Sequence, residues 1–436
     1  MVRDVLMKEK LNEEFITKLS NKKQEPGWML EHRKKAYQEF LRQPEPNFGP
    51  EIKINFEEIC YYKDKTNNLT NKWDKVSCNI KNTFDNLGVI DAEKKYLGGV
   101  TNQYESEVFY HNQVIDDGII FTSTDDALQK YPELFKKYFN NLVKYTENKY
   151  TALNNAVWSG GSFIYIPKGV KVDKPLQSYF RIESESLGQF EHTIIIVDDD
   201  AELSYIEGCT ATAYSKTSLH AGVVEIYVGK NAKCRYSTIQ NWSTDVYNLV
   251  TKRAIVDENG LMEWVDGNIG SCLTMKYPSC ILKGDNSMGN SISIAYAKKG
   301  QVLDAGAKMI HLGKNTKSSI ISKSIAEGGG IANYRGTTHI TKKAINSKAT
   351  IKCDTILLDA YSASDTFPKN IVGNISSSLT HEATVSKLDA DKLFYLTSKG
   401  LTEDRARELL IMGFISDFKK ELPMEYAVEL NRLIKE

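Results

Sequence analysis

The segment LTHEATVSK, Leu379–Lys387, sets a histidine directly before a glutamate. Thiolate, imidazole and carboxylate groups are the side chains that hold iron or an iron–sulfur cluster, and the chain has only seven histidines and seven cysteines. Adjacent side chains of a regular strand point to opposite faces. His381 and Glu382 therefore reach one ion together only at a strand end or a bulge, and the pair alone does not make a metal site.

The seven cysteines, at 60, 78, 209, 234, 272, 280 and 353, are scattered and form no CxxC motif. This pattern indicates reduced thiols and argues against a closed structural zinc site. Cys353, in SKATIKCDTILLD, shares a strand face with Ile351 and Leu357, as a buried core cysteine does. Cys209, in YIEGCTATAY, follows a glycine at a predicted strand end, where a thiol is easier to expose. A structural and a reactive role both stay open for these two thiols.

Composition narrows the classes of partner. The 436 residues are 41% hydrophobic, which suits a well-buried globular core, and Lys plus Arg balance Asp plus Glu at 56 each. Because the net charge is zero, the overall charge does not indicate nucleic acid or an anionic membrane as a partner. The N-terminal segment is charged throughout and no stretch approaches the ~18 apolar residues of a membrane span. We expect a cytoplasmic protein.

The pattern of hydrophobic and polar residues changes twice along the chain and divides it into regions 1–155, 156–387 and 388–436. The first is helical from Leu11 to about Leu41, is then broken by QPEPNFGP, and continues as a mixed stretch with a helical pattern at 131–145. The last shows helical patterns again: DADKLFYLTSKG, a helix start at Thr402, and LPMEYAVELNRLI with an apolar stripe. The ends are therefore predicted to be helical or mixed.

The middle region consists of short β-branched runs separated by polar turns. Turn signals DDDA, GKNA, DENG, GKNT and INSKA begin near 198, 229, 257, 313 and 345, and helical periodicity is absent. More than two hundred residues of near-repeating strands without helices between them favour a solenoid, meaning a parallel β-helix, over a closed barrel. A β-sandwich is the structural alternative.

Standard catalytic motifs are missing from the sequence. It has no P-loop, no GxGxxG between strand and helix, no GxSxG and no HExxH. The acidic run Asp198, Asp199 and Asp200 is compatible with calcium or with the carboxylates of a β-helix carbohydrate-active enzyme. Its position between TIIIV and AELSYI favours a solvated turn.

Long ordered motifs give the chain a family resemblance. They include EPGWMLEHRKKAYQEFL, YLGGVTNQYESEVFYH, NAVWSGGSFIYIPKGV, IEGCTATAYSKTSLHAGVVEI, KMIHLGKNTKSSIISKSI, KCDTILLD, HEATVSK and LFYLTSKGLTEDRARELLIMGFI. From about residue 20 to the C-terminus the chain resembles the SufB/SufD family of iron–sulfur cluster assembly proteins. The N-terminal EPGWMLEHR and the joint presence of EGC, KCD and HEA favour its SufB branch over SufD.

The resemblance implies a right-handed parallel β-helix between helical ends and a scaffold protein, not an enzyme. A SufB-like subunit works with SufD and with the ATPase SufC, which binds the C-terminal helical region and would carry the missing P-loop. Sulfur comes from a cysteine desulfurase system, SufS with SufE or SufU, and a transient iron–sulfur cluster is built at the SufD interface for apo-protein recipients. A homodimer, a reduced flavin in the complex and a plastid stromal location also stay open.

Site residues follow from the same resemblance. Cys209 is the predicted sulfur acceptor, Cys353 the predicted cluster thiol, and His381 and Glu382 its predicted co-ligands. The polar route through the β-helix interior is predicted to use Arg181, Gln240, Trp242 and Lys252, and we expect the cations Arg181 and Lys252 to lower a thiol or persulfide pKa. Two alternatives remain: an architectural SufD-like subunit without cluster ligands, and the carbohydrate-active enzyme.

Overall fold

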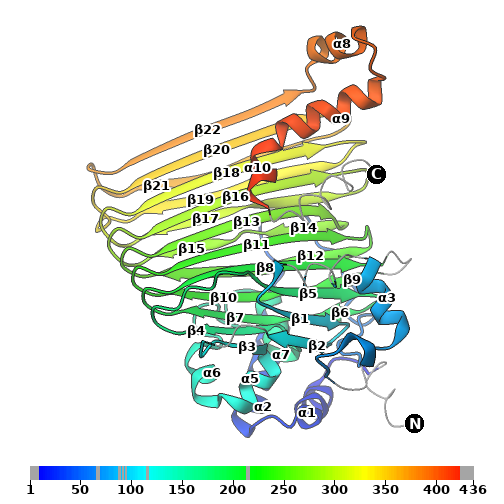
Figure 1. The fold of residues 1–436 in the computed structure, drawn as a ribbon, viewed down its shortest axis with the longest axis vertical. Coiled ribbons are helices and arrows are strands. Elements are labelled where there is room, and N and C mark those ends of the chain that lie inside the picture. Colours follow the sequence, from blue (N-terminus) through cyan, green and yellow to red (C-terminus); the bar gives the residue numbers. More distant parts are fainter. Residues whose placement is uncertain are drawn as a thin grey trace.

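The chain folds as a parallel β-helix of about eight turns with helices at both ends (Figure 1). The computed structural model describes residues 9–64, 69–86, 90, 93, 96–113, 117–212 and 217–422. Each turn gives one strand to each of two facing sheets. This confirms the predicted fold class and sets the β-sandwich aside, because neighbouring strands within both sheets run parallel along the solenoid.

The first sheet carries most of the predicted site residues. Its strands lie in the order β2 (Glu107–Gln113), β1 (Gly99–Tyr104), β5 (Leu176–Ile182), β8 (Glu202–Ala211), β11 (Lys233–Trp242), β13 (Leu261–Gly270), β16 (Met288–Ala297), β18 (Lys317–Ala326), β20 (Lys348–Leu357) and β22 (Ser378–Lys387). Only the pair β1 and β2 is antiparallel here. From β8 onward these strands are long and straight, so equivalent positions stack from one turn to the next.

The second sheet faces the first across the core. Its strands lie in the order β21 (Thr366–Val372), β19 (Ile331–Ile340), β17 (Val302–His311), β14 (Leu273–Lys276), β12 (Val246–Val256), β10 (Val223–Val228), β7 (His192–Val197), β4 (Ser162–Ile166) and β3 (Ile120–Ser123), with the short strands β6 (Gly188–Gln189), β9 (Ser218–His220) and β15 (Ser279–Leu282) beside this path. Strands β1, β2 and β3 come from the region before residue 156. The solenoid therefore takes in part of the predicted mixed stretch.

A ladder of turn residues fixes the length of the coils. Asp200, Asn231, Asn259 and Asn286 all have φ between 55° and 61°, a left-handed conformation that Asn and Asp tolerate. Their side chains bond from turn to turn, with Nδ2 to Oδ1 distances of 2.8 Å from Asn231 to Asp200, 3.0 Å from Asn259 to Asn231 and 3.1 Å from Asn286 to Asn259. The predicted turns near 198, 229 and 257 are confirmed, and Asn286 adds one that the sequence analysis missed.

Helices cover the lower end of the solenoid and one outer face. They are α1 (Glu13–Lys22), α2 (Gly27–Arg42), α3 (Cys78–Asn86), α5 (Thr124–Lys130), α6 (Pro132–Tyr138) and α7 (Lys149–Val157) in the N-terminal half, with a 3-10 turn at Trp73–Lys75, and α8 (Ala390–Ser398), α9 (Glu403–Phe414) and α10 (Ser416–Glu421) near the C-terminus. Ile411, Ile415 and Phe418 of the C-terminal helices pack on outward-facing residues of the first sheet, such as Ile206 and Ile239.

Two helical predictions need correction. The helix expected from Leu11 to Leu41 is two helices, because the chain turns between Lys22 and Gly27. The helical pattern at 131–145 gives only α6, because the Glu225 carboxylate accepts hydrogen bonds from the backbone N–H groups at 140, 142 and 143 and holds them in a turn. The predicted LPMEYAVELNRLI helix begins at the end of the described residues and lies almost wholly outside them.

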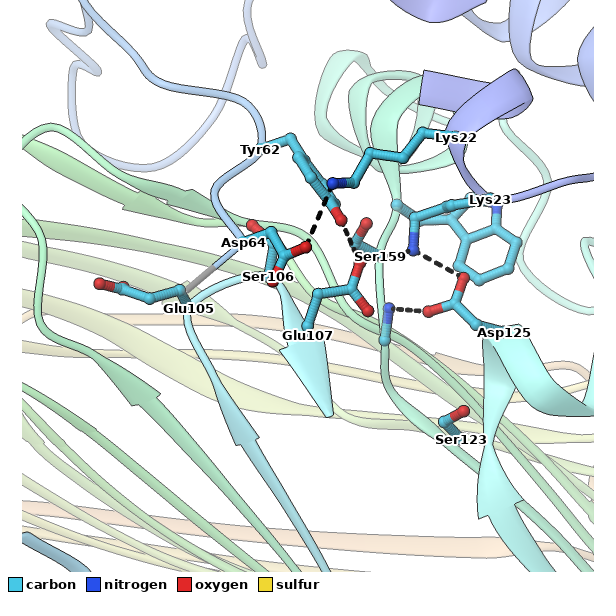
Figure 2. A network of polar contacts seen from close by, with 12 residues as sticks. Lys22, Lys23, Tyr62, Asp64, Glu105, Ser106, Glu107, Ser123, Asp125 and Ser159 are labelled. Carbon is cyan, nitrogen blue, oxygen red and sulfur yellow. Dashed lines mark hydrogen bonds and ion pairs between the residues drawn. The ribbon is translucent and has the colours of Figure 1, made fainter. Parts of the chain in front are cut away.

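A partly buried polar network ties the end of the first helix to the start of the first sheet (Figure 2). Lys23 Nζ lies 2.9 Å from Asp125 Oδ1 and 3.3 Å from Glu107 Oε1, and the Tyr62 hydroxyl donates to the same Glu107 carboxylate. Lys22 pairs with Asp64 at 3.1 Å. These contacts anchor the helical cap on the lower coils. In the described part of the chain, no helix combines the length and apolar character needed to cross a bilayer.

Candidate functional site

Cys209 lies inside the β-helix with its side chain fully buried. On β8 it stands in register between Phe180 of β5 and Gln240 of β11, and Trp242 lies in the same buried cluster. The expectation that the preceding glycine would expose this thiol at a strand end is wrong, because β8 runs on to Ala211 and keeps the side chain in the interior.

Two polar groups approach the Cys209 sulfur. Glu207 Oε1 lies 3.8 Å and Gln240 Nε2 4.0 Å from Sγ. Burial raises the pKa of the Cys209 thiol well above its ordinary value, and the negative charge of Glu207 adds to the rise. The charge of Lys252 lowers this pKa, as expected, but burial outweighs it, and Arg181 is not among the groups that shift it most. The Lys252 ammonium lies 3.0 Å from the Glu207 carboxylate, which neutralises it.

Arg181 lies on the other face of its strand. It stands in register with Thr210, and its guanidinium donates to Thr210 Oγ1 at 3.0 Å and to Thr212 Oγ1 at 2.7 Å. Because side chains alternate along a strand, Arg181 is on the outer face while Phe180 and Cys209 are inside. The structure brings Gln240, Trp242 and Lys252 into the interior with Cys209, but not Arg181.

Trp242 belongs to a second group of buried polar residues that the sequence analysis did not single out. Its ring lies 4.6 Å, centroid to centroid, from that of His220. The His220 imidazole bonds the Glu191 carboxylate and, at 2.7 Å, Asn248 Oδ1. Trp242 Nε1 has no hydrogen-bond partner among the described residues. A buried indole N–H without a partner is a donor open to an anion or a water molecule.

A line of buried polar side chains follows the strand register from the Cys209 region toward the C-terminal end of the solenoid. Matching positions of β8, β11, β13, β16, β18 and β20 are occupied by Glu207, Thr238, Asp266, Ser293, Ser322 and Cys353. All six are buried, and Ser293 Oγ lies 3.2 Å from Ser322 Oγ. Adjacent strands are about 4.8 Å apart, so these six side chains stack in one row through the core from Glu207 to Cys353.

Cys353 lies near the upper end of the solenoid, on β20 beside the last strand β22 (Figure 1). Its Sγ is 3.9 Å from His381 Nε2, and His381 Nδ1 is 3.1 Å from Asn370 Nδ2. Burial raises the pKa of Cys353 to about 12, with Tyr334 offsetting part of the rise. Partial burial lowers the pKa of His381, which favours the neutral imidazole that binds metals.

Glu382 lies on the opposite face of β22 from His381. The register of β20 and β22 runs without a shift, pairing Ile351 with His381, Lys352 with Glu382 and Cys353 with Ala383. No bulge in β22 turns Glu382 toward the thiol, and its side chain is exposed. The structure therefore joins Cys353 and His381 but separates Glu382 from them.

The Cys353 and His381 pair is incomplete as a metal centre. Across the described residues, no group of three or more His, Cys, Asp or Glu side chains could hold a metal ion, whereas iron–sulfur clusters take about four protein ligands. The pair lies where both sheets end, because β22 and β21 have neighbours on one side only. Exposed apolar side chains, Ile371, Val372 and Val385, occupy these two strands.

The acidic run at 198–200 is part of the turn ladder. Asp198 Oδ1 accepts the backbone N–H of Asp199 at 2.8 Å, and Asp199 Oδ1 accepts that of Lys230 at 2.8 Å. These carboxylates are occupied in holding two coils together. The arrangement favours the solvated turn over a calcium site or a pair of catalytic carboxylates.

Comparison with known proteins agrees with this architecture. Residues 180–414 match the family model described as SUF system FeS cluster assembly, SufBD core domain, and residues 10–178 match the SufBD protein N-terminal region. The chain belongs to the SufBD family. It is 56% identical over 429 residues to proteins named iron-sulfur cluster assembly SufBD family protein in Staphylococcus saprophyticus, Staphylococcus aureus and Staphylococcus epidermidis, covering 98% of this chain and 92% of each relative. The family predicted from the motifs is confirmed, and with it a part in iron–sulfur cluster assembly by the SUF system.

Proposed function

We propose that this SufBD protein is the SufB-like scaffold subunit of the SUF complex, which accepts sulfur at Cys209 and builds a nascent iron–sulfur cluster beside Cys353. The observation that carries the proposal is the Cys353 and His381 pair at the open end of the β-helix, 3.9 Å apart and short of ligands. A half-built site at an unpaired sheet edge is what a cluster shared between two chains requires. An architectural SufD-like subunit would need neither a buried thiol nor a neutral imidazole there.

Sulfur acceptance at Cys209 is a thiol exchange that needs no external oxidant. The Cys209 thiolate attacks the terminal sulfur of the donor's persulfide, a new S–S bond forms at Cys209, and the donor's S–S bond breaks to release its thiolate. One persulfide is lost and one is formed. Because burial raises the Cys209 pKa, the step requires the donor, or a partner that opens the site, to bring the thiol into its reactive form.

The polar line from Glu207 to Cys353 supports transfer through the interior. Thr238 Oγ1 and Trp242 Nε1 are buried and have no hydrogen-bond partner among the described residues. A buried polar atom without a hydrogen-bond partner lowers the stability of the fold unless a water molecule or a ligand bonds to it. Reduction of the Cys209 persulfide by a two-electron donor of the complex, such as the reduced flavin, would release the outer sulfur as sulfide and regenerate the Cys209 thiolate. This sulfide would meet the hydroxyls of the line, while its two carboxylates are neutralised by Lys252 and Lys276. Iron and sulfide are the cargo of this route and reach the site from the partners.

The partners are assigned by the same reasoning. SufD, or a second copy in a homodimer, would complete the cluster site across the open edges of β21 and β22. SufC would dock on the C-terminal helices, where α8 has no buried residue and exposes Phe394 and Tyr395. The sulfur would come from SufS with SufE or SufU, and the complex would work in the cytoplasm. Glu382, on the outer face, would act toward the partner chain.

Persulfide mapping tests the sulfur step. The full chain, with its SufC and SufD partners, is incubated with cysteine and its cysteine desulfurase system, and each cysteine peptide is analysed by mass spectrometry. We expect persulfide at Cys209 in the wild type and in Cys234→Ser, a matched buried thiol elsewhere in the core, and none in Cys209→Ser. Persulfide at Cys353 with Cys209 untouched would contradict the proposal.

A further inference from the structure

The Gln240 side chain is held in one orientation by two donors. Lys276 Nζ and Asn248 Nδ2 each lie 2.9 Å from Gln240 Oε1. The oxygen of an amide is identified by the donors around it, so the two contacts assign the carbonyl to this side. The Gln240 amide nitrogen is thereby turned toward Cys209, where Nε2 lies 4.0 Å from Sγ.

The Gln240 N–H is the donor that the Cys209 sulfur meets. The other polar group near Sγ is Glu207 Oε1, at 3.8 Å, which can accept a hydrogen bond from a thiol but repels a thiolate or persulfide anion. Lys252, the nearby cation, is engaged by Glu207 and by the Tyr236 hydroxyl at 3.4 Å. Stabilisation of anionic sulfur by a hydrogen bond therefore falls to Gln240.

Lys276 is a buried cation with no role in the predicted site. It lies at the end of β14, beside Val250 of β12, and its side chain is fully buried. Asp266 Oδ1, on β13 across the interior, lies 2.9 Å from Nζ. Burial lowers the pKa of Lys276 to about 8, with Asp266 opposing the shift. A buried ion pair adds little net stability compared with an apolar pair of similar volume, so stability alone does not account for it.

We propose that Lys276 is a positioning residue for sulfur acceptance: anchored by Asp266, it fixes the Gln240 carbonyl so that the amide N–H points at the Cys209 sulfur. The inference rests on the proposed role of Cys209. It adds two residues of facing sheets, Lys276 and Asp266, to the machinery of that step. Lys276 also lowers the pKa of Cys209 directly through its positive charge. Removing Asp266 with it leaves the net charge of the interior unchanged, so a double-mutant comparison with Gln240 isolates the effect exerted through the amide.

The test uses the full chain and removes both charges together. Lys276→Met with Asp266→Asn avoids leaving either charge buried alone, the main cause of misfolding for such changes. The control is Lys323→Met with Asp354→Asn, a second Lys and Asp pair, 3.0 Å apart and 16% exposed, on β18 and β20 of the first sheet. Gln240→Met is made alone and together with the Lys276 and Asp266 changes. Circular dichroism and thermal melting confirm that each variant is folded. If the first variant is not, Lys276→Gln with Asp266→Asn serves: it keeps a donor for the Gln240 carbonyl without either charge, and Cys209 should then react as in the wild type.

The first readout is independent of sulfur delivery. Alkylation of Cys209 by iodoacetamide is followed against pH on its peptide by mass spectrometry, with the exposed thiol Cys78 as internal reference. We expect the Lys276 and Asp266 variant to lower Cys209 reactivity at a given pH about tenfold, the value of one hydrogen bond to an anion. Gln240→Met should do the same, the combined variant should be no slower, and the control pair should react as wild type does.

The second readout is the yield of Cys209 persulfide with the desulfurase system, and the two readouts separate the two ideas. Unchanged Cys209 reactivity in the Lys276 and Asp266 variant, or a further full loss when its changes are added to Gln240→Met, would overturn the positioning role. Absence of persulfide from wild-type Cys209, with the expected reactivity changes intact, would instead overturn the proposed sulfur acceptance and leave the geometry of Lys276 standing.

Discussion

At the residue scale, buried ionisable groups inside the β-helix depend on one another. Glu207 and Lys252 are both fully buried and lie 3.0 Å apart. Desolvation opposes the charge on each, and the opposite charge of the partner restores it. Each of the two residues is therefore charged only because the other is present, and together they add no net charge next to Cys209.

Breaking this pair should destabilise the protein more than deleting it. Glu207→Gln removes the main counter-charge of the buried Lys252 ammonium and leaves only the weaker effect of Asp266. We expect a loss of about 3 to 5 kcal/mol, and adding Lys252→Met should recover most of that loss. The free energy of unfolding of the coils that contain β8 and β12, measured in urea by hydrogen–deuterium exchange, reports both effects. A double variant as unstable as the single one would contradict the pairing.

The raised pKa of Cys353 predicts its chemistry before metal arrives. With a pKa of about 12, the thiolate fraction stays small at neutral pH and rises about tenfold per pH unit, while an ordinary thiol levels off above its pKa near 8.5. Alkylation of Cys353 between pH 7 and 9.5 should therefore show no plateau. His381→Ala should change this profile because its Nε2 lies 3.9 Å from Sγ. Glu382→Ala, on the opposite face, should not, and an equal effect of the two variants would refute the assignment of faces.

At the element scale, the turn ladder sets the register on which the interior depends. Asn259 combines a left-handed φ of 55° with side-chain bonds to Asn231 and Asn286. A register shift of one residue would turn every inward side chain outward. The line from Glu207 to Cys353 exists only because the turns hold each coil at its length.

Substitutions at Asn259 should separate the contribution of its side-chain hydrogen bonds from that of its left-handed backbone conformation. Asn259→Gly tolerates the positive φ but loses the ladder bonds, and Asn259→Ala loses the bonds and also strains the backbone by about 1 kcal/mol. We expect local protection of the β12 to β13 turn against hydrogen–deuterium exchange to fall in the order Asn, Gly, Ala. Alanine as well protected as asparagine would show that the ladder contributes nothing.

Sequence periodicity predicted the elements better than it predicted their contacts. The polar turn signals and the absence of helical periodicity were enough to predict a parallel β-helix, but the turn at Asn286, which follows the short strand β15, was missed. The alternation of His381 and Glu382 was predictable from the two-residue period of a strand.

The contacts between side chains of different coils across the interior could not be predicted from the sequence. Lys252 meets a carboxylate 45 residues away, and the partners of Lys276 lie on two other strands, Asp266 on β13 and Gln240 on β11. Such contacts depend on the number of residues in each coil, which the turn signals give only approximately. Arg181 was expected inside for the same reason, since its facing depends on the register of β5.

At the scale of the whole molecule, the two thiols occupy different places: Cys209 lies on β8 in the interior, and Cys353 lies on β20 near one end of the solenoid. The helical cap closes the lower coils, so the core is sealed there, while β21 and β22 leave the upper edge open (Figure 1). Cys209 is enclosed by its own chain, whereas Cys353 lies on β20, next to the edge strand β22. This asymmetry fits sulfur taken up inside one subunit and a cluster completed between two.

The most direct test of the cluster site is anaerobic reconstitution of the chain with its SufC and SufD partners, iron and a desulfurase-driven sulfur source, read by visible absorption and Mössbauer spectra. Cys280→Ala is the matched control, because Cys280 is an equally buried thiol that accepts from Trp264 Nε1 at 3.2 Å. We predict a cluster spectrum in the wild type and in Cys280→Ala, and its loss in a folded Cys353→Ala. A cluster of wild-type yield in Cys353→Ala would contradict the account.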